Sequence, residues 1–189
     1  MQLRNAGSGL KKVFICQIVS AICTVILLFV QIQLINHLVL FLSCVFLICK
    51  LIGLNEAIND IKGCKIAFCL AVTQLVLMLE SMSRLWGMGN IKSGILIAIY
   101  ITDFLTLYFV CSSVAKVLSE HSYEEIAAQG KIAWKMNLVF YAAKIIVILL
   151  PFTPILRTFV FLIRVVTVIV SLDADIQYIS FLYKSYKVL

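Results

Sequence analysis

The sequence predicts an all-α membrane protein, a polytopic helical bundle with six transmembrane helices arranged as three antiparallel hairpins. Of its 189 residues, 63% are hydrophobic and 13% are charged, whereas soluble domains average roughly 45–50% apolar and 25% charged residues. The apolar residues fall into six runs of about 20 residues, each long enough to cross a hydrocarbon core of about 30 Å. Because no Pro- or Gly-rich linker divides the chain, we expect residues 1–189 to form one domain.

The six spans follow one another with short connections. The first comes after a basic segment, as in a signal peptide, but its apolar run is long and no small-residue cleavage site follows, so we interpret it as an uncleaved span. The very short connection at 31–33 predicts a tight hairpin. Pro151 and Pro154 mark the break between the last two spans because proline disfavours a continuous helix. The expected spans are 13–32, 34–54, 65–83, 93–116, 132–151 and 154–173.

The tail at 174–189 is open to two interpretations. One is an amphipathic helix lying in the inner membrane interface, because polar and apolar residues occupy opposite faces at helical spacing. The other is a continuation of the sixth span into the cytoplasm. The polar stripe comprises Gln177, Ser180, Lys184 and Lys187, and the apolar face comprises Ile176, Ile179, Leu182, Tyr183 and Tyr186.

The distribution of basic residues predicts the orientation of the bundle. Eleven of the sixteen lie before the first span, around the second and fourth connections, and in the tail, whereas Arg84, Lys92 and Arg157 lie at the other end. Because cytoplasmic loops are enriched in Lys and Arg, we expect a multi-pass protein of the cell (plasma) membrane with both termini in the cytoplasm. The eleven are Arg4, Lys11, Lys12, Lys50, Lys62, Lys65, Lys116, Lys131, Lys135, Lys184 and Lys187.

A weak internal repeat recurs every 66 residues. It aligns Lys50 with Lys116, residues 65–68 with 131–134, and His37 with Asp103. A true repeat would favour pseudo-threefold packing of the hairpins about the membrane normal. The alternative is chance, because lysine is common just before a membrane span.

Two basic residues lie inside the apolar runs of the last hairpin. Lys144 and Arg164 would each cost about 2.5–3.5 kcal/mol at the centre of a membrane helix, so each should face protein and have a partner. Asp103 is the best candidate partner, because it lies thirteen residues above Lys116 just as Lys144 lies thirteen above Lys131. Both would then be about 20 Å from the inner boundary.

Further polar residues share helix faces with these charges. Asn137 and Tyr141 align with Lys144 on the fifth span, Arg157 aligns with Arg164 on the sixth, and His37 reaches a similar depth on the second. If the faces converge, they enclose a polar core with two excess positive charges, which would favour an anionic ligand. In the alternative interpretation Asp103 and Lys144 form one packing pair, Arg157 reaches the outer interface, and Arg164 pairs with a lipid phosphate or a partner subunit.

Other functional classes lack support in the sequence. The seven cysteines match neither a disulfide framework nor a zinc site, and no catalytic or cofactor motif occurs, so we expect neither an enzyme nor a bound cofactor or metal. The net charge of +7 is spread over short loops, so its expected counterpart is the lipid bilayer and not nucleic acid.

These observations leave two main hypotheses. The first is a small transporter, channel or solute-binding membrane subunit for an anionic small solute. The second is a non-transporting interaction protein, such as an assembly, sensor or immunity subunit, whose charges serve packing within a homo-oligomer or against a partner membrane subunit.

Overall fold

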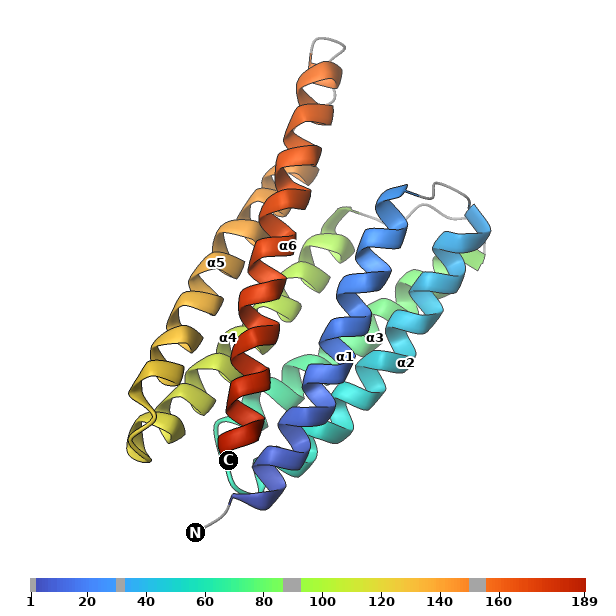
Figure 1. Cartoon of the computed structure of the whole chain (residues 1–189). Coiled ribbons are helices and arrows are strands. Elements are labelled where there is room, and N and C mark those ends of the chain that lie inside the picture. The colour runs from blue at the N-terminus through green and yellow to red at the C-terminus, as the bar shows by residue number, and fades with distance from the viewer. Residues whose placement is uncertain (1–2, 30–32, 87–92, 150–155) are drawn as a thin grey trace.

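The computed structural model describes residues 3–29, 33–86, 93–149 and 156–189, and the described residues form six helices and no strand (Figure 1). Side chains at 24–29, 33–37, 84–86, 156–165 and 167–168 lie outside the described part. The helices are α1 (Arg4–Phe29), α2 (Gln33–Ile58), α3 (Cys64–Trp86), α4 (Ser93–Glu120), α5 (Glu124–Leu149) and α6 (Leu156–Val188).

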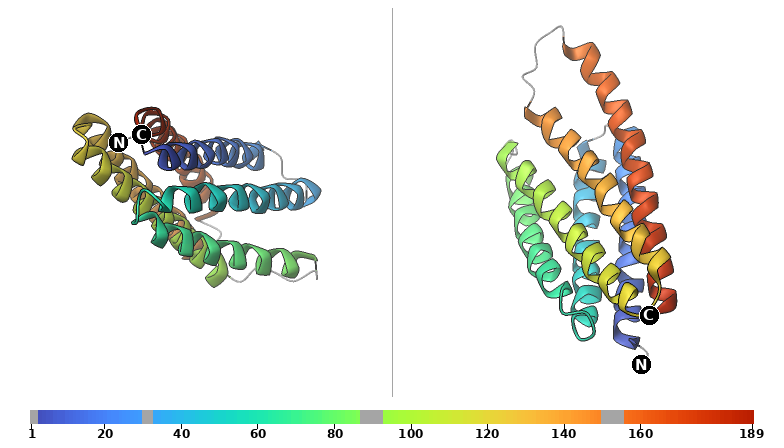
Figure 2. Two further views of the ribbon diagram at one scale, coloured as in Figure 1. Left: turned by 90° about the horizontal axis from the view of Figure 1, so that it is seen from below. Right: turned by 90° about the vertical axis from the view of Figure 1, so that its left-hand side faces the viewer.

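The six helices pack side by side in chain order. Each described helix contacts its neighbours in the sequence, and α6 returns to contact α1. Both chain termini and the links α2–α3 and α4–α5 lie at the same end of the bundle, called the inner end below (Figures 1 and 2). Since packing continues from each helix to the next, the division into three hairpins and the 66-residue repeat both stay predictions.

The helices extend beyond the apolar runs that predicted them. Five have the length and composition of membrane spans, within Arg4–Cys23, Leu38–Ile58, Cys64–Ser83, Ser93–Glu120 and Glu124–Leu149. The fifth helix begins eight residues before the expected span at 132, since Glu124 and Glu125 in its first turn favour the positive end of the helix dipole. The connections at the inner end are correspondingly shorter than expected.

The outward faces of the helices are apolar, and the mainly apolar interior contains several polar residues. Large apolar side chains are exposed along the helices, for example Ile15, Phe41, Val76, Val139 and Ile176. An apolar surface of this extent is stable against lipid, whereas in water it would aggregate. The buried polar residues are Lys50, Gln74, Ser81, Thr106, Asn137, Ser171 and Ser185.

Polar contacts hold α1 against the inner end of α2. The backbone N–H of Ala6 in the first turn of α1 donates to the Asp60 carboxylate at 2.8 Å, where the helix dipole favours a negative charge. Lys12 forms an ion pair with Glu56, whose carboxylate also accepts a hydrogen bond from Ser8. These contacts fix α1 and α2 relative to the α2–α3 link.

A three-residue turn joins α4 to α5. Ser122 has φ of 66°, the left-handed conformation in which a helix often ends. The backbone N–H groups of Ser122 and Tyr123 bond the carbonyls of Ser119 and Leu118, at 3.2 and 2.9 Å. The turn therefore satisfies the last carbonyls of α4 and reverses the chain within a few residues.

The tail continues the sixth helix, as in the second of its two interpretations, and its location in the cytoplasm stays a prediction. Residues 174–188 continue α6 without a break, and Ala174, Tyr178, Phe181, Leu182 and Ser185 are buried. This stripe packs against α1 and α5, as Figure 1 shows for the lower half of α6. The described segment therefore forms no separate interfacial helix. Of the apolar face inferred from the sequence, only Leu182 is buried, whereas Ile176 and Tyr183 are exposed.

Candidate functional site

Asp103 lies at the centre of the polar interior. Its carboxylate oxygen Oδ1 lies 3.6 Å from the ammonium of Lys50 on α2. Its other oxygen, Oδ2, accepts a hydrogen bond from the hydroxyl of Tyr141 on α5. The Lys50 side chain is only 8% exposed, so its charge depends on this carboxylate. Asp103 therefore ties α4 to both α2 and α5.

The structure pairs Asp103 with Lys50 and not with the expected Lys144. The ends of the helices explain the difference. Asp103 lies seventeen residues before Glu120 at the end of α4, and Tyr141 lies seventeen after Glu124 at the start of α5. Tyr141 is therefore level with Asp103, and Lys144 lies about one turn higher. The sequence-based depths were counted from Lys116 and Lys131. Lys116 lies four residues before the end of α4, whereas Lys131 lies seven residues after the start of α5, so equal counts from these lysines do not give equal depths.

Lys144 lies among aromatic rings. Its ammonium is 4.1 Å from the ring centroid of Phe140, 4.8 Å from that of Tyr100 and 5.5 Å from that of Tyr141. The electron-rich faces of such rings attract a cation. Among the described residues, no carboxylate lies within ion-pair distance of Lys144. Its charge is therefore held by ring faces and by longer-range attraction.

A second carboxylate belongs to the same cluster. Asp175 on α6 accepts a hydrogen bond from the Gln17 side chain of α1 at 3.2 Å and lies within electrostatic range of Lys144, Asp103 and Lys50. We call Lys50, Asp103, Tyr141, Lys144 and Asp175 the core cluster. Its two lysines balance its two carboxylates, so the described charges show no positive excess.

Asn137 serves the contact between α5 and α6. It is almost fully buried, and its amide donates to the carbonyls of Ala133 at 3.0 Å and Ala174 at 3.1 Å. Both donor hydrogens are thus used within the bundle. Asn137, one helical turn from Tyr141 toward the inner end, therefore joins α5 to α6.

The core cluster lies where tight packing of α4 and α5 ends. Buried residues run from Thr106 to Leu118 on α4 and from Ala127 to Tyr141 on α5, and the described residues nearer the outer end are half-buried or exposed. Asp103 has a side-chain exposure of 31%, and Lys144 and Asp175 are also half-buried. The cluster therefore faces the more open half of the bundle.

Three candidate residues fall outside this description. His37 belongs to α2, and Arg157 and Arg164 belong to α6, but their side chains lie outside the described part of the chain. The expected convergence of Arg164 with Lys144 stays a prediction.

The sequence did not identify Lys50 and Asp175 as members of the core cluster, nor Gln17 as the hydrogen-bond donor to Asp175. The sequence predicts Lys50 near the inner boundary of the membrane. However, α2 continues to Ile58, so Lys50 lies eight residues before the end of the helix. The apolar residues after it, Leu51, Ile52 and Leu54, were the available signal. Nothing in the local sequence distinguishes Asp175 from Asp173, since only tertiary packing selects the one that faces α1.

All seven cysteines are free, and the described residues contain no group of three or more His, Cys, Asp or Glu side chains suited to a metal ion. Comparison of the chain with protein-family models, with curated proteins and with solved structures found no match.

Proposed function

We propose that the chain is a six-span integral membrane protein of the plasma membrane with both termini in the cytoplasm. Five described helices have the length and composition of membrane spans, and their outward faces carry large aliphatic side chains. Most of the basic residues lie toward the inner end, at the starts of α1, α3 and α5, in the α2–α3 link, and near the ends of α4 and α6. The positive-inside rule makes that end cytoplasmic.

Within this setting, we propose that the protein is a small transporter or solute-binding membrane subunit for an anionic solute. The observation that supports this is the environment of Lys144, a half-buried ammonium that faces three aromatic rings and has no close carboxylate among the described residues. An ionisable group inside a membrane bundle is costly and commonly marks a functional site. A bound carboxylate or phosphate would supply a counter-charge at closer range than Asp103 and Asp175, and the rings would contact its apolar part.

The test measures binding of defined anions to the purified protein. Thermal unfolding is followed at constant ionic strength with chloride, acetate, glutamate or inorganic phosphate, for the parent chain, Lys144→Gln and the control Lys65→Gln. At about 100 times Kd, a ligand stabilises the folded state by about 2.7 kcal/mol, or a shift of roughly 5–10 °C for a chain of this size. At least one anion should raise the midpoint of the parent and of the control, and Lys144→Gln should lose the shift.

A result with no shift for any of the four anions, or an equal shift in Lys144→Gln, would contradict the proposal. Uptake of the stabilising anion into proteoliposomes then separates a transporter from a binding subunit.

The packing of Asp103 supports a second candidate, a non-transporting membrane interaction protein. Asp103 is engaged by Lys50 and Tyr141, and Asn137 uses both its donors within the bundle. Such contacts fix helix packing without any ligand. If this function holds, Lys144→Gln changes neither anion response nor transport, and co-purification identifies a second copy or a partner membrane subunit.

A further inference from the structure

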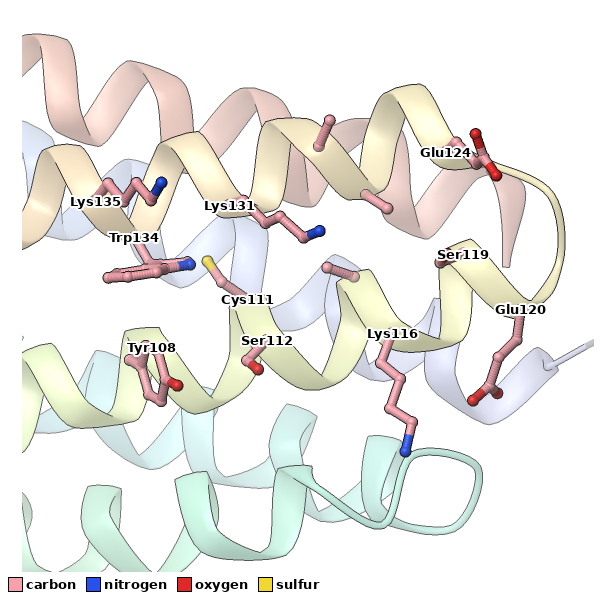
Figure 3. Close-up of a pocket in the computed structure, with 13 residues that line it drawn as sticks. Tyr108, Cys111, Ser112, Lys116, Ser119, Glu120, Glu124, Lys131, Trp134 and Lys135 are labelled. Carbon is pink, nitrogen blue, oxygen red and sulfur yellow. The ribbon is translucent and has the colours of Figure 1, made fainter.

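A groove with a volume of about 1090 Å³ runs between α4 and α5 at their inner ends (Figure 3). It lies apart from the core cluster, and all its lining residues belong to these two helices. Tyr108 and Trp134 close its far end, with their ring centroids 5.2 Å apart and their planes at 90°. This edge-to-face contact is a stable arrangement for aromatic rings.

Three lysines make the groove basic. Lys116 extends from α4, and Lys131 and Lys135 extend from α5 (Figure 3). All three are exposed, and within the described part of the chain none forms an ion pair. The groove also contains Glu120 and Glu124, which lie at its end nearest the turn (Figure 3). Lys131 extends over the space between the helices, whereas the Lys116 ammonium extends from α4 away from α5 (Figure 3). The middle of the groove therefore presents the Lys131 ammonium without an ion-pair partner among the described residues.

The same surface becomes apolar toward the outer end of the bundle. On α5, Lys131 and Lys135 are followed at spacings of three to four residues by Leu138, Ala142, Ile146 and Leu149, all exposed. Residues at such spacing share one helix face. A ligand that fits both parts has an anionic head and long apolar tails, which a soluble anion lacks.

We propose that this groove binds the headgroup of an anionic phospholipid, with the lipid phosphate at Lys131 between Lys116 and Lys135 and the acyl chains along the exposed face of α5. The proposal rests on the membrane location proposed above but not on the solute site at Lys144. Basic pockets between helices at the cytoplasmic side are suited to acidic lipid headgroups, and each lysine near the membrane surface contributes roughly fivefold in relative affinity. Trp134 contributes an amphipathic ring of the kind enriched at membrane interfaces.

Trp134 lines the groove and can report lipid binding by its fluorescence. The chain has two tryptophans, so Trp86→Phe leaves Trp134 as the only one. This variant is reconstituted in phosphatidylcholine vesicles that contain equal fractions of brominated phosphatidylglycerol or brominated phosphatidylcholine. Bromine quenches indole fluorescence on contact, so the ratio of the two quenching constants measures the preference of the groove for an anionic headgroup.

The test compares two triple variants in the Trp86→Phe background. Lys116→Gln/Lys131→Gln/Lys135→Gln removes the charges of the groove. The matched control Lys11→Gln/Lys62→Gln/Lys65→Gln removes three exposed lysines at the same end of the bundle but outside the groove. Thermal unfolding of both variants verifies that they fold.

The parent should prefer brominated phosphatidylglycerol at least fivefold, the groove variant should fall near a ratio of one, and the control should keep the preference. Equal quenching by both lipids in the parent would overturn the proposal. An equal loss of the lipid preference in both triple variants would also overturn it, because it would indicate attraction by net charge alone. Loss of the preference on addition of inorganic phosphate, with sodium chloride at equal ionic strength as the reference, would assign the groove to a soluble anion and overturn the lipid assignment.

Discussion

At the scale of single residues, the charge of Lys50 controls the stability of the interior. Its ammonium is nearly excluded from the surface and has one carboxylate partner, Asp103. Removing one member of a buried pair commonly costs about 3–5 kcal/mol, whereas removing both together costs far less. Asp103 is about one-third exposed, so we place the expected cost at the lower end of that range.

A double-mutant cycle tests this dependence. Asp103→Asn keeps an acceptor for Tyr141 but removes the charge, and it should lower the free energy of unfolding by about 3 kcal/mol because Lys50 remains buried and unpaired. Lys50→Met together with Asp103→Asn should lie within about 1 kcal/mol of the parent. Unfolding in mixed micelles measures both. Additive effects of the two single substitutions would show that the groups do not interact.

The sequence predicted that charges lie in the interior and that Asp103 is a central acceptor, but it did not predict the partner. Asp103 and Lys144 are identifiable because a charge interrupts an apolar run. Lys144 is not the partner of Asp103 because it lies about one helical turn farther from the α4–α5 turn than Asp103 does. This difference in depth depends on where α4 ends and where α5 begins. α4 ends at Glu120 and α5 begins at Glu124, on either side of a turn that apolar periodicity does not reveal.

At the scale of elements, α1 and α2 approach each other through glycine. A Cβ added to Gly9 would lie 2.3 Å from the Gly53 carbonyl oxygen, and one added to Gly53 would lie 2.6 Å from that of Gly9. Backbone atoms cannot yield as a flexible side chain does. Small residues at a helix crossing allow close packing where the hydrophobic effect between helices is absent.

Gly53→Ala should therefore force α1 and α2 apart and lower the free energy of unfolding by about 1–3 kcal/mol. Gly94→Ala is the matched control, because a Cβ at Gly94 in α4 meets nothing within 4 Å and alanine is the better helix former there. Thermal unfolding in one detergent compares the two. Equal midpoints for both variants would contradict the close crossing.

The sequence predicts the helices well and their contacts poorly for a physical reason. Apolar length identifies a helix because a bilayer requires about 20 residues to cross it. The inward face of each helix is weakly marked, because lipid-facing and core-facing positions are both apolar. The tail shows the same limit: its amphipathic pattern is real, but the buried stripe through Tyr178 and Phe181 faces α1 and α5 and not the membrane.

At the scale of the whole molecule, orientation determines which leaflet the α4–α5 groove can reach. Glu125 lies at the inner end of the bundle and Ser93 at the opposite end, and both are exposed. Because basic residues concentrate near Glu125 and cytoplasmic ends are enriched in Lys and Arg, we expect that end to lie in the cytoplasm.

We expect an impermeant maleimide to label Ser93→Cys on intact cells and Glu125→Cys only after permeabilisation. The parent chain is the control, because five of its cysteines are buried and the exposed Cys49 and Cys69 lie within helices expected to face lipid. The reverse pattern would invert the bundle and place Lys116, Lys131 and Lys135 at the outer leaflet. Labelling of both variants on intact cells would place both ends outside and contradict an odd number of crossings between them, which the single helix α4 requires.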